Sequence, residues 1–250
     1  NTGAVACYRC LLASPAGRTV RLFARGARSS PLHLENPHMP SFNASDLTKE
    51  QSYKLLNGAI VPRPIAWVST VSEEGIHNLA PFSWFNAVAV QPPTVAFSVG
   101  LDDVERGFKD TYVNLTASGE CVVNIVSAAA ASAMNVCGTA FDPATDEFVE
   151  AGVTPIASEL VRPMRVQESP VQLECKLHQI VTLENEKGRN DLMICSVLRI
   201  HVNESVYLGD YKIDPDKLQA VGRMGGTVYA RTRETFTMER NHIVENRKPS

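Results

Sequence analysis

Two long segments with alternating apolar and polar residues lie close together in the sequence, at residues 171–183 and 191–202. The clearest alternation is VQLECKLH, at residues 171–178. A period of two puts successive side chains on opposite faces of a strand, so each segment predicts a β-strand with one buried face. The polar run ENEKGRN, at 184–190, is expected to form the connection of a hairpin. A hairpin of this length commits the chain to an antiparallel sheet.

Shorter strand-like segments occur on both sides of this hairpin. We expect them at residues 65–71, 76–80, 88–90, 94–99, 121–126 and 206–208, with a turn at 73–75 and a break at Pro92-Pro93. Three short helices are expected, at about 45–58, 108–117 and 128–134. Many strands, few helices and no strand–helix alternation predict an antiparallel barrel with added helices.

Composition excludes several classes of function. The chain has 250 residues, of which 44% are hydrophobic and 20% charged, as in ordinary globular proteins. The formal net charge of -3 gives no reason to expect nucleic-acid binding. No run of about 18 apolar residues occurs, so we expect no membrane span.

The first 40 residues differ from the rest. Residues 1–34 contain five arginines and no acid. Such a composition is typical of an organellar transit peptide, or simply of an unstructured tail. We therefore expect an N-terminal extension at 1–40 and one folded domain at 41–250, in a cytoplasmic or mitochondrial protein. Cys7 and Cys10 lack partners at zinc spacing, so no metal site is expected.

Polar residues interrupt the apolar strands at a few places. Ser69 and Thr70 end the first strand, and Asn78 and Ser83 punctuate the next segments. The run Lys109-Asp110-Thr111 stands at the start of the second expected helix. A lysine and a hydroxyl beside the free N–H groups of a helix N-terminus suit a phosphate. The alternative is that Asp110 simply caps the helix.

Familiar hydrolase motifs are absent. The sequence has no G-x-S-x-G and no H-E-x-x-H, and none of its closely spaced carboxylates suggests a glycosidase. His77, His178 and His201 stand alone, which is more typical of surface or strand-face residues than of catalytic bases. The aromatic cluster of Phe82, Trp84 and Phe85 suits either a flat heterocycle or a core. In such a protein a cofactor would supply the chemistry.

Five sequence blocks occur in one order from about Tyr53 to about Tyr229. They are NGAIVPRPIAWVST, GIHNLAPFSWFNAVAVQPPTVAFSV, KDTYVNLTASGECVVNIVS, ESPVQLECKL and VGRMGGTVYA. Together they resemble the flavin-reductase-like family of FMN-binding split barrels, which includes flavoredoxin and related flavoprotein oxidoreductases. The resemblance implies a mainly β fold: an antiparallel split β-barrel of Greek-key type with a few short peripheral helices.

The resemblance also implies an FMN site built from several blocks. Arg63 and Pro64 would shape its entrance, Lys109 and Thr111 would hold the phosphate, and Arg223 would approach late in the chain. The full set of implied FMN contacts is Arg63, Pro64, Trp67, Ser69, Thr70, Asn78, Ala80, Pro81, Phe82, Ser83, Lys109, Thr111, Arg223 and Tyr229. No catalytic residue and no metal ligand are implied. Trp84 stands where many relatives have Phe or Tyr, and its bulk would narrow access to the flavin.

The activity implied is hydride transfer from NAD(P)H to flavin N5, in a homodimer with FMN near the subunit interface. The electron acceptor would be free flavin, a ferric complex, oxygen or a partner oxygenase. Two alternatives remain: an FMN-dependent oxidase or oxygenase acting on a small organic molecule, and a non-enzymatic FMN-binding protein. A barrel without a cofactor is the remaining reading.

Overall fold

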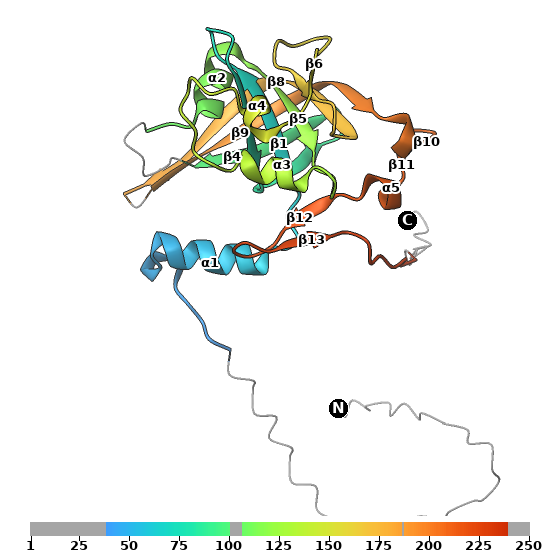
Figure 1. Ribbon diagram of the computed structural model, residues 1–250. Coiled ribbons are helices and arrows are strands. Elements are labelled where there is room, and N and C mark those ends of the chain that lie inside the picture. Colours follow the sequence, from blue (N-terminus) through green and yellow to red (C-terminus); the bar gives the residue numbers. More distant parts are fainter. Residues whose placement is uncertain (1–38, 101–106, 187, 240–250) are drawn as a thin grey trace, which may run out of the picture. The chain divides into compact units, whose positions relative to one another are not determined.

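The long hairpin consists of β8 (Val171–Asn185) and β9 (Gly188–Val202) in the computed structural model of the chain (Figure 1). The structure describes residues 39–100, 107–186 and 188–239. Those from Phe42 on belong to one unit, which is described here by itself. Apart from residues 39 and 40, the expected N-terminal extension lies outside the described residues. This holds also for its C-x-x-C motif and for the residues on which the transit-peptide interpretation is based.

Seven strands form one antiparallel sheet in the order β2-β1-β5-β8-β9-β4-β3. The strands not yet given are β1 (Ala66–Val71), β2 (His77–Phe82), β3 (Phe85–Ala89), β4 (Thr94–Gly100) and β5 (Glu120–Ile125). The two edge strands, β2 and β3, follow each other in the chain through Ser83 and Trp84. The sheet forms a split barrel, which confirms the predicted fold class.

Three small strand pairs and five short helices surround the barrel. The pairs are β6 (Pro155–Ile156) with β7 (Arg165–Val166), β10 (Tyr207–Gly209) with β11 (Lys212–Ile213), and β12 (Val221–Arg223) with β13 (Tyr229–Arg231). The helices are α1 (Lys49–Ala59), α2 (Asp110–Ser118), α3 (Ala131–Val136), α4 (Glu147–Ala151) and α5 (Pro215–Leu218). Two 3-10 turns, η1 (Ala44–Asp46) and η2 (Glu204–Val206), complete the described elements.

Capping residues set the helix ends. Thr48 and Gln51 form a reciprocal capping box at the start of α1, so the prediction of a cap at Ser45 or Thr48 is confirmed for Thr48. Gly119 ends α2 in the left-handed conformation, at φ 70°, as expected. α3 begins three residues later than predicted, at Ala131, because a turn occupies the preceding residues. The sequence interpretation missed α4 and α5.

Two strand predictions need correction. The predicted strand at 88–90 is β3, at Phe85–Ala89. The predicted connection at 184–190 is mostly strand, since β8 continues to Asn185 and β9 resumes at Gly188. The end of this hairpin is exposed on both faces, so polar residues continue the backbone pairing without a buried side. Proline is tolerated within β2 because that strand lies at the edge of the sheet.

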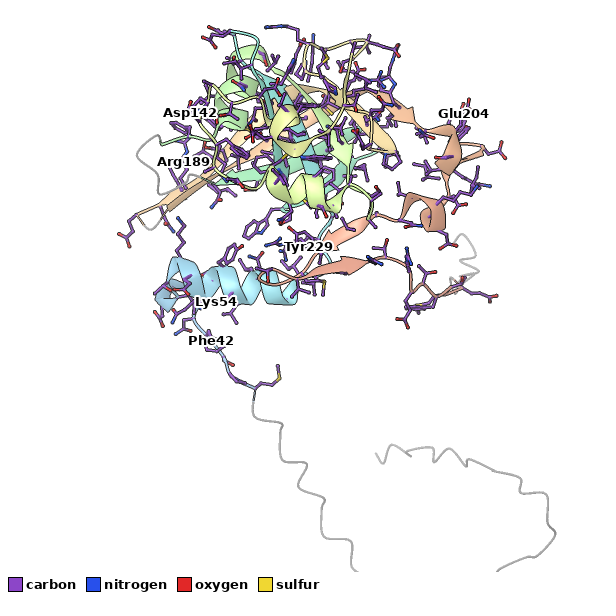
Figure 2. All side chains as sticks on the ribbon, viewed as in Figure 1. Phe42, Lys54, Asp142, Arg189, Glu204 and Tyr229 are labelled. Carbon is purple, nitrogen blue, oxygen red and sulfur yellow. The ribbon has the colours of Figure 1, made fainter. Side chains whose placement is uncertain are left out.

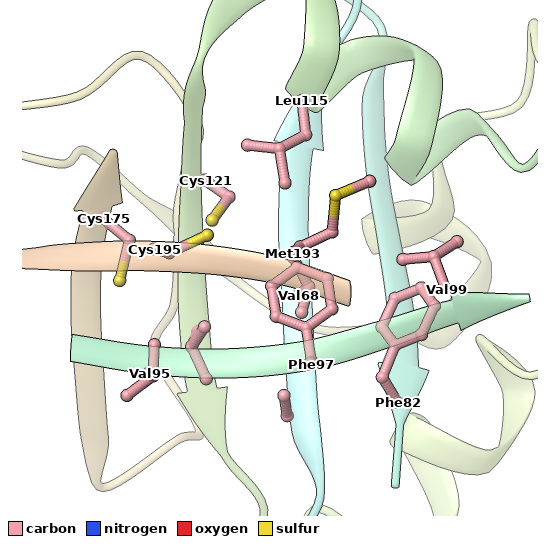
Figure 3. Close-up of a cluster of buried hydrophobic side chains, with 12 residues drawn as sticks. Val68, Phe82, Val95, Phe97, Val99, Leu115, Cys121, Cys175, Met193 and Cys195 are labelled. Carbon is pink, nitrogen blue, oxygen red and sulfur yellow. The ribbon is translucent and has the colours of Figure 1, made fainter. Parts of the chain in front are cut away.

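The barrel interior is one cluster of apolar side chains. Figure 3 shows its members, which come from the sheet and from α2: Ala66, Val68, Phe82, Val95, Phe97, Val99, Leu115, Cys121, Val123, Cys175, Met193 and Cys195. The three cysteines are free thiols with no exposed surface, as expected of small apolar residues. Hydrogen bonding with the Cys175 and Cys195 thiols, together with burial, raises the pKa of the Cys121 thiol.

A second apolar cluster lies on the other face of β1. Ala66 and Val68 point into the barrel, whereas Ile65 and Trp67 pack with residues of α3 and α4 such as Met134 and Phe148. β1 is therefore buried along its whole length, which accounts for its continuous apolar sequence. Its position between two cores makes β1 the structural centre of the unit.

Close packing at Gly222 yields a first prediction. A Cβ on Gly222 would lie 2.7 Å from Pro62 Cβ and 3.4 Å from the Arg63 carbonyl oxygen. We expect Gly222→Ala to lower the free energy of unfolding by about 1–3 kcal/mol, because the proline ring has little freedom to move. The measurement is urea-induced unfolding.

Gly58→Ala is the matched control. Nothing lies within 4 Å of its added Cβ, and the residue is within α1. We expect the same or a higher stability, by up to about 1 kcal/mol, because alanine is the better helix former. Equal stability of the two variants would contradict the close approach of β12 to Pro62.

Candidate functional site

Two pockets adjoin the connection between β2 and β3. The large pocket has a volume of about 1220 Å³ and is lined by residues between 44 and 56, by Pro81–Trp84, Ser98, Gly100 and Lys109, and by residues 182–186 and 188–190. The small pocket, of about 330 Å³, is lined by Tyr53, Ile65, Pro81, Ser83, Met134, Asn135, Gly138, Thr139, Arg223 and Tyr229. Tyr53, Pro81 and Ser83 line both pockets, so the two are neighbours.

The large pocket brings together an aromatic wall and a helix N-terminus. Trp84 is 42% exposed, and its indole N–H donates to Asn57 Oδ1 at 3.0 Å. Lys109 occupies the N-cap position of α2, so the alternative that Asp110 caps this helix is wrong. Gly100 approaches Asn190 closely, since an added Cβ would lie 3.0 Å from Asn190 Oδ1. A flat ring and an anion would both find partners here.

Of the predicted FMN contacts, Pro81, Phe82, Ser83 and Lys109 line the large pocket. The structure therefore brings together residues from two sequence blocks that lie more than 25 residues apart. Arg223 and Tyr229 line the small pocket instead. Pro64 is exposed but lines neither pocket, and Ala80 packs against the barrel core.

Arg63 is buried and its guanidinium contacts main-chain carbonyls. Nη1 donates to the carbonyl oxygens of Asn57 and Ile60, both at 2.9 Å, and Nη2 donates to that of Met224 at 3.0 Å. Its Nε lies 3.5 Å from Ser83 Oγ. The guanidinium thus joins the end of α1, the segment after β12 and the wall shared by both pockets.

Trp67 and Ser69 are fully buried and line neither pocket. Trp67 belongs to the cluster beneath α3 and α4. The Ser69 hydroxyl donates to the Met164 carbonyl oxygen at 2.5 Å, and Asn124 fixes the neighbouring main chain of β1 through the Trp67 carbonyl oxygen. Both side chains hold the barrel together in this structure.

The other predicted hydroxyl and amide residues form a buried network. Asn78 Oδ1 accepts from the Thr70 hydroxyl at 3.1 Å and from the Thr111 hydroxyl at 2.8 Å. Asn114 Nδ2 donates to Thr70 Oγ1 at 3.2 Å, and Asn78 Nδ2 donates to Glu147 Oε2 at 2.8 Å. This network connects β1 and β2 with α2 and α4. It lies directly behind the first turn of α2 and fixes the position of that turn.

The network ends at Glu147, whose carboxyl group is buried and has a raised pKa. It is 5% exposed, and its Oε2 also accepts the backbone N–H of Leu79 at 2.5 Å. Burial raises the pKa of this carboxyl to about 7, the Leu79 N–H opposes the shift, and the nearby carboxylates of Asp110 and Asp146 add to it. The protonation of Glu147 therefore changes near neutral pH.

The small pocket contains a stacked cation. The Arg223 guanidinium lies over the Tyr229 ring, 4.4 Å from its centroid, and Nη2 donates to the Gly226 carbonyl oxygen. Tyr229 projects from β13 toward α3, where its hydroxyl lies 3.4 Å from Asn135 Oδ1 (Figure 2). The Arg63 and Arg223 main chains pair through two hydrogen bonds, so both arginines are fixed at the same place.

Sequence reasoning missed several pocket residues. Tyr53 and Asn135 stand in segments with no polar signal of their own, and Asn57 is inconspicuous within α1. Arg189 lines the large pocket near the end of the hairpin (Figure 2), and its guanidinium lies 5.6 Å from the centroid of the Phe108 ring. These residues are brought together by tertiary contacts, which a linear motif does not encode.

His201 is a strand residue of β9, as expected, but it does not stand alone. Its Nε2 lies 2.7 Å from Glu174 Oε1, and the fully buried Glu174 carboxylate also accepts the backbone N–H groups of Glu159 and Leu160. The pair anchors the loop before β7 and lies away from both pockets. Within the described residues, no group of three or more His, Cys, Asp or Glu side chains is arranged to hold a metal ion.

The chain belongs to the flavin-reductase-like family. A sequence profile described as "Flavin reductase like domain" matches residues 58–217. An uncharacterized protein of Halalkalibacterium halodurans is 35% identical over 208 residues, which cover 82% of this chain and 99% of the relative. This finding confirms the resemblance inferred from the five sequence blocks.

Two solved structures extend the comparison. Nitrilotriacetate monooxygenase component B from Bacillus cereus is 36% identical, with a TM-score of 0.76 over 80% of this chain and 99% of that chain. The 2-nitrobenzoate 2-nitroreductase of Pseudomonas fluorescens is 27% identical, with a TM-score of 0.73 over 84% and 100%. The family and these neighbours identify the chain as a flavin-reductase-like flavoprotein of the oxidoreductase class. None of the helices in the described residues has both the length and the apolar character needed to cross a bilayer.

The buried carboxyl of Glu147 predicts a pH-dependent stability. Its folded-state pKa, about 7, lies above the unfolded value near 4.5, so the folded protein holds this proton more tightly. Its contribution to the free energy of unfolding is complete below pH 4.5 and falls as the pH rises to about 7, by on the order of 2–3 kcal/mol. We expect Glu147→Gln to remove this loss, because an amide oxygen still accepts both hydrogen bonds.

The measurement is denaturant-induced unfolding of both proteins between pH 4.5 and 8. Glu150→Gln is the matched control, because Glu150 is an exposed residue of the same helix. A constant difference between wild type and Glu147→Gln across this range would contradict the raised pKa.

Proposed function

We propose that the protein is an FMN-binding oxidoreductase that accepts hydride from NAD(P)H. The observation that carries the proposal is the large pocket, in which the aromatic wall at Trp84 and the N-terminus of α2 face one space. Its volume of about 1220 Å³ exceeds the range of ~300–1,000 Å³ usual for ligand sites, so it has room for a ring system with a phosphorylated tail.

The donor set of the large pocket fits FMN. Lys109 and the N–H groups at the start of α2 would hold the phosphate, because a cation and a helix N-terminus both attract an anion. Phe82 and Trp84 would pack against the ring system, and the hydroxyls of Ser83 and Ser98 would hydrogen-bond to its polar edge or to the ribityl chain.

Five of the predicted FMN contacts take a supporting role in this proposal. Trp67, Ser69, Thr70, Asn78 and Thr111 are buried, and the four polar members spend their side chains on hydrogen bonds within the protein. They would hold β1, β2 and the first turn of α2 in place behind the flavin. A rigid site costs less entropy on binding than a mobile one.

Bound FMN would supply a ring that accepts hydride at N5. The chain's own residues would orient that ring and exclude water from its inner face. The Arg63 guanidinium fixes Ser83, and the Asn57–Trp84 hydrogen bond fixes the indole, so both walls of the pocket are set before a ligand arrives. Each substrate would then enter from the open side.

The comparisons support two different electron acceptors. One relative is named as component B of a monooxygenase, which favours a partner oxygenase that uses reduced flavin. The other is named as a nitroreductase, which favours direct reduction of an organic substrate. The higher identity of the first, 36% against 27%, makes a reductase that serves a partner oxygenase our first proposal. An FMN-dependent enzyme acting directly on an organic molecule is the second.

Spectroscopy on the purified protein tests this function. After incubation with FMN and desalting, we expect a retained two-band flavin spectrum that bleaches when NADH or NADPH is added without oxygen. A retained spectrum that only an organic substrate alters would favour the second candidate. Retention without any turnover would favour a non-enzymatic FMN-binding protein, and no retained flavin would contradict tight FMN binding.

A substitution at Lys109 tests the proposed phosphate-binding site directly. We expect Lys109→Ala to weaken FMN binding by roughly 10- to 150-fold, the equivalent of ~1.5–3 kcal/mol for a charge-assisted contact. The measurement is quenching of flavin fluorescence during titration. Lys54→Ala is the matched control, because Lys54 is an exposed lysine of α1 that pairs with Glu50. An unchanged FMN affinity of Lys109→Ala would remove this residue from the site.

We further propose a homodimer. The edge strand β3 exposes four of its five residues, and Val88 and Val90 are 57% and 89% exposed. Leu56 and Ile60, at the end of α1, are also exposed. Apolar side chains gathered beside an open sheet edge are typical of an association surface. Light scattering should give about twice the chain mass of 27.3 kDa, and a monomer mass would contradict this proposal.

A further inference from the structure

The small pocket is distinct in its electrostatics. Arg223 is the one charged residue among those that line it, and the rest are aromatic, hydroxyl, amide or apolar residues. In the part of the chain that the structure describes, no carboxylate lies within 4.0 Å of the Arg223 guanidinium. Its charge is therefore balanced by the Tyr229 ring and by the Gly226 carbonyl oxygen.

A second cation strengthens the positive character of this place. Burial lowers the pKa of Arg63, Tyr53 opposes that shift, and the charge of Arg223 lowers it further. The main chains of the two arginines are hydrogen-bonded to each other, so two cations are held in one place. The N–H groups of the Arg63 guanidinium donate to main-chain carbonyl oxygens and to Ser83. Arg223 is therefore the cation that faces the small pocket. An anion placed there would lower the electrostatic energy of both arginines.

The size and the lining of the small pocket suit a small planar anion. Its volume of about 330 Å³ lies at the lower end of the range for ligand sites, with room for one ring system. Tyr229 holds the Arg223 guanidinium by stacking, and a fixed guanidinium suits the two oxygens of a carboxylate. Tyr53 and Ile65 supply apolar surface for a ring, and Asn135 and Thr139 supply further polar groups.

We propose that the small pocket is a subsite for a small aromatic carboxylate, with Arg223 as the residue that recognises its charge. This inference deepens the second candidate of the proposed function, the enzyme that acts directly on an organic molecule, and rests on it, because it names the class of substrate that would meet the flavin. Tyr53, Pro81 and Ser83 belong to both pockets, so a ring in the small pocket would lie beside a ring in the large one. Arg223 is then a specificity-determining residue.

The test compares two probes of the same shape, benzoate and benzamide, which differ in charge. Their dissociation constants are measured by ligand-observed NMR on flavin-free protein and again after loading with FMN. We expect the wild type to bind benzoate about tenfold more tightly than benzamide, because the charge-assisted contact adds about 1.4 kcal/mol. We expect Arg223→Gln to bring the two affinities together. Equal affinities in the wild type would overturn the proposal.

Arg231→Gln is the matched control, because Arg231 is an exposed arginine of β13, the strand that pairs with the β12 strand of Arg223, and it lines neither pocket. We expect it to keep the wild-type preference for benzoate. A loss of preference equal to that of Arg223→Gln would reveal a general effect of charge and overturn the proposal. If Arg223→Gln does not fold, Arg223→Lys provides the test: it should keep part of the preference, since it keeps the charge but loses the planar fork.

The readings on flavin-free and flavin-loaded protein separate this inference from the proposed function. Failure to retain FMN would contradict the proposed function while leaving the benzoate preference measurable. With FMN retained, benzoate should shift the visible flavin bands of the wild type and of Arg231→Gln, but not those of Arg223→Gln. A shift that survives in Arg223→Gln would place the probe elsewhere and overturn the assignment.

Discussion

The buried guanidinium of Arg63 holds together the parts of the chain that form both pockets. It binds the main-chain carbonyls of Asn57, Ile60 and Met224, which belong to segments more than 150 residues apart. A buried charge is costly unless every donor finds an acceptor, so these segments are held at fixed positions around it. The Pro-Arg-Pro sequence before β1 thus brings together the end of α1 and the segment after β12. In the described structure its first role is architectural.

A second constraint fixes the corner where a phosphate would bind. Asn78 is hydrogen-bonded to Thr70, Thr111 and Glu147, so β1, β2, α2 and α4 meet in one network of buried polar side chains. Such a network is stabilising only while all its members are paired, and losing one leaves the others unsatisfied. The N-terminus of α2 is therefore held in position by residues that do not line the large pocket. The raised pKa of Glu147 couples that position to pH.

Much of the fold follows from local sequence patterns, and less of the site does. The alternation in VQLECKLH correctly predicts the strand β8. Thr48 and Gly119 correctly predict the start of α1 and the end of α2. These signals act within a few residues, so the sequence alone reveals them. The run ENEKGRN predicts a connection where most of the residues are strand, since polar composition does not distinguish a loop from a strand exposed on both faces. The motif residues were found, but whether a hydroxyl faces a pocket or a buried partner depends on tertiary packing.

The three cysteines inside the barrel carry a practical consequence. Cys121, Cys175 and Cys195 come from three different strands, have no exposed surface and remain free thiols. A thiol reagent needs both contact and a thiolate; burial inside the barrel prevents the first, and the raised pKa of Cys121 disfavours the second. Their modification therefore requires the strands to separate. The rate at which a thiol reagent modifies these three cysteines therefore reports how often the barrel opens, and no label has to be introduced.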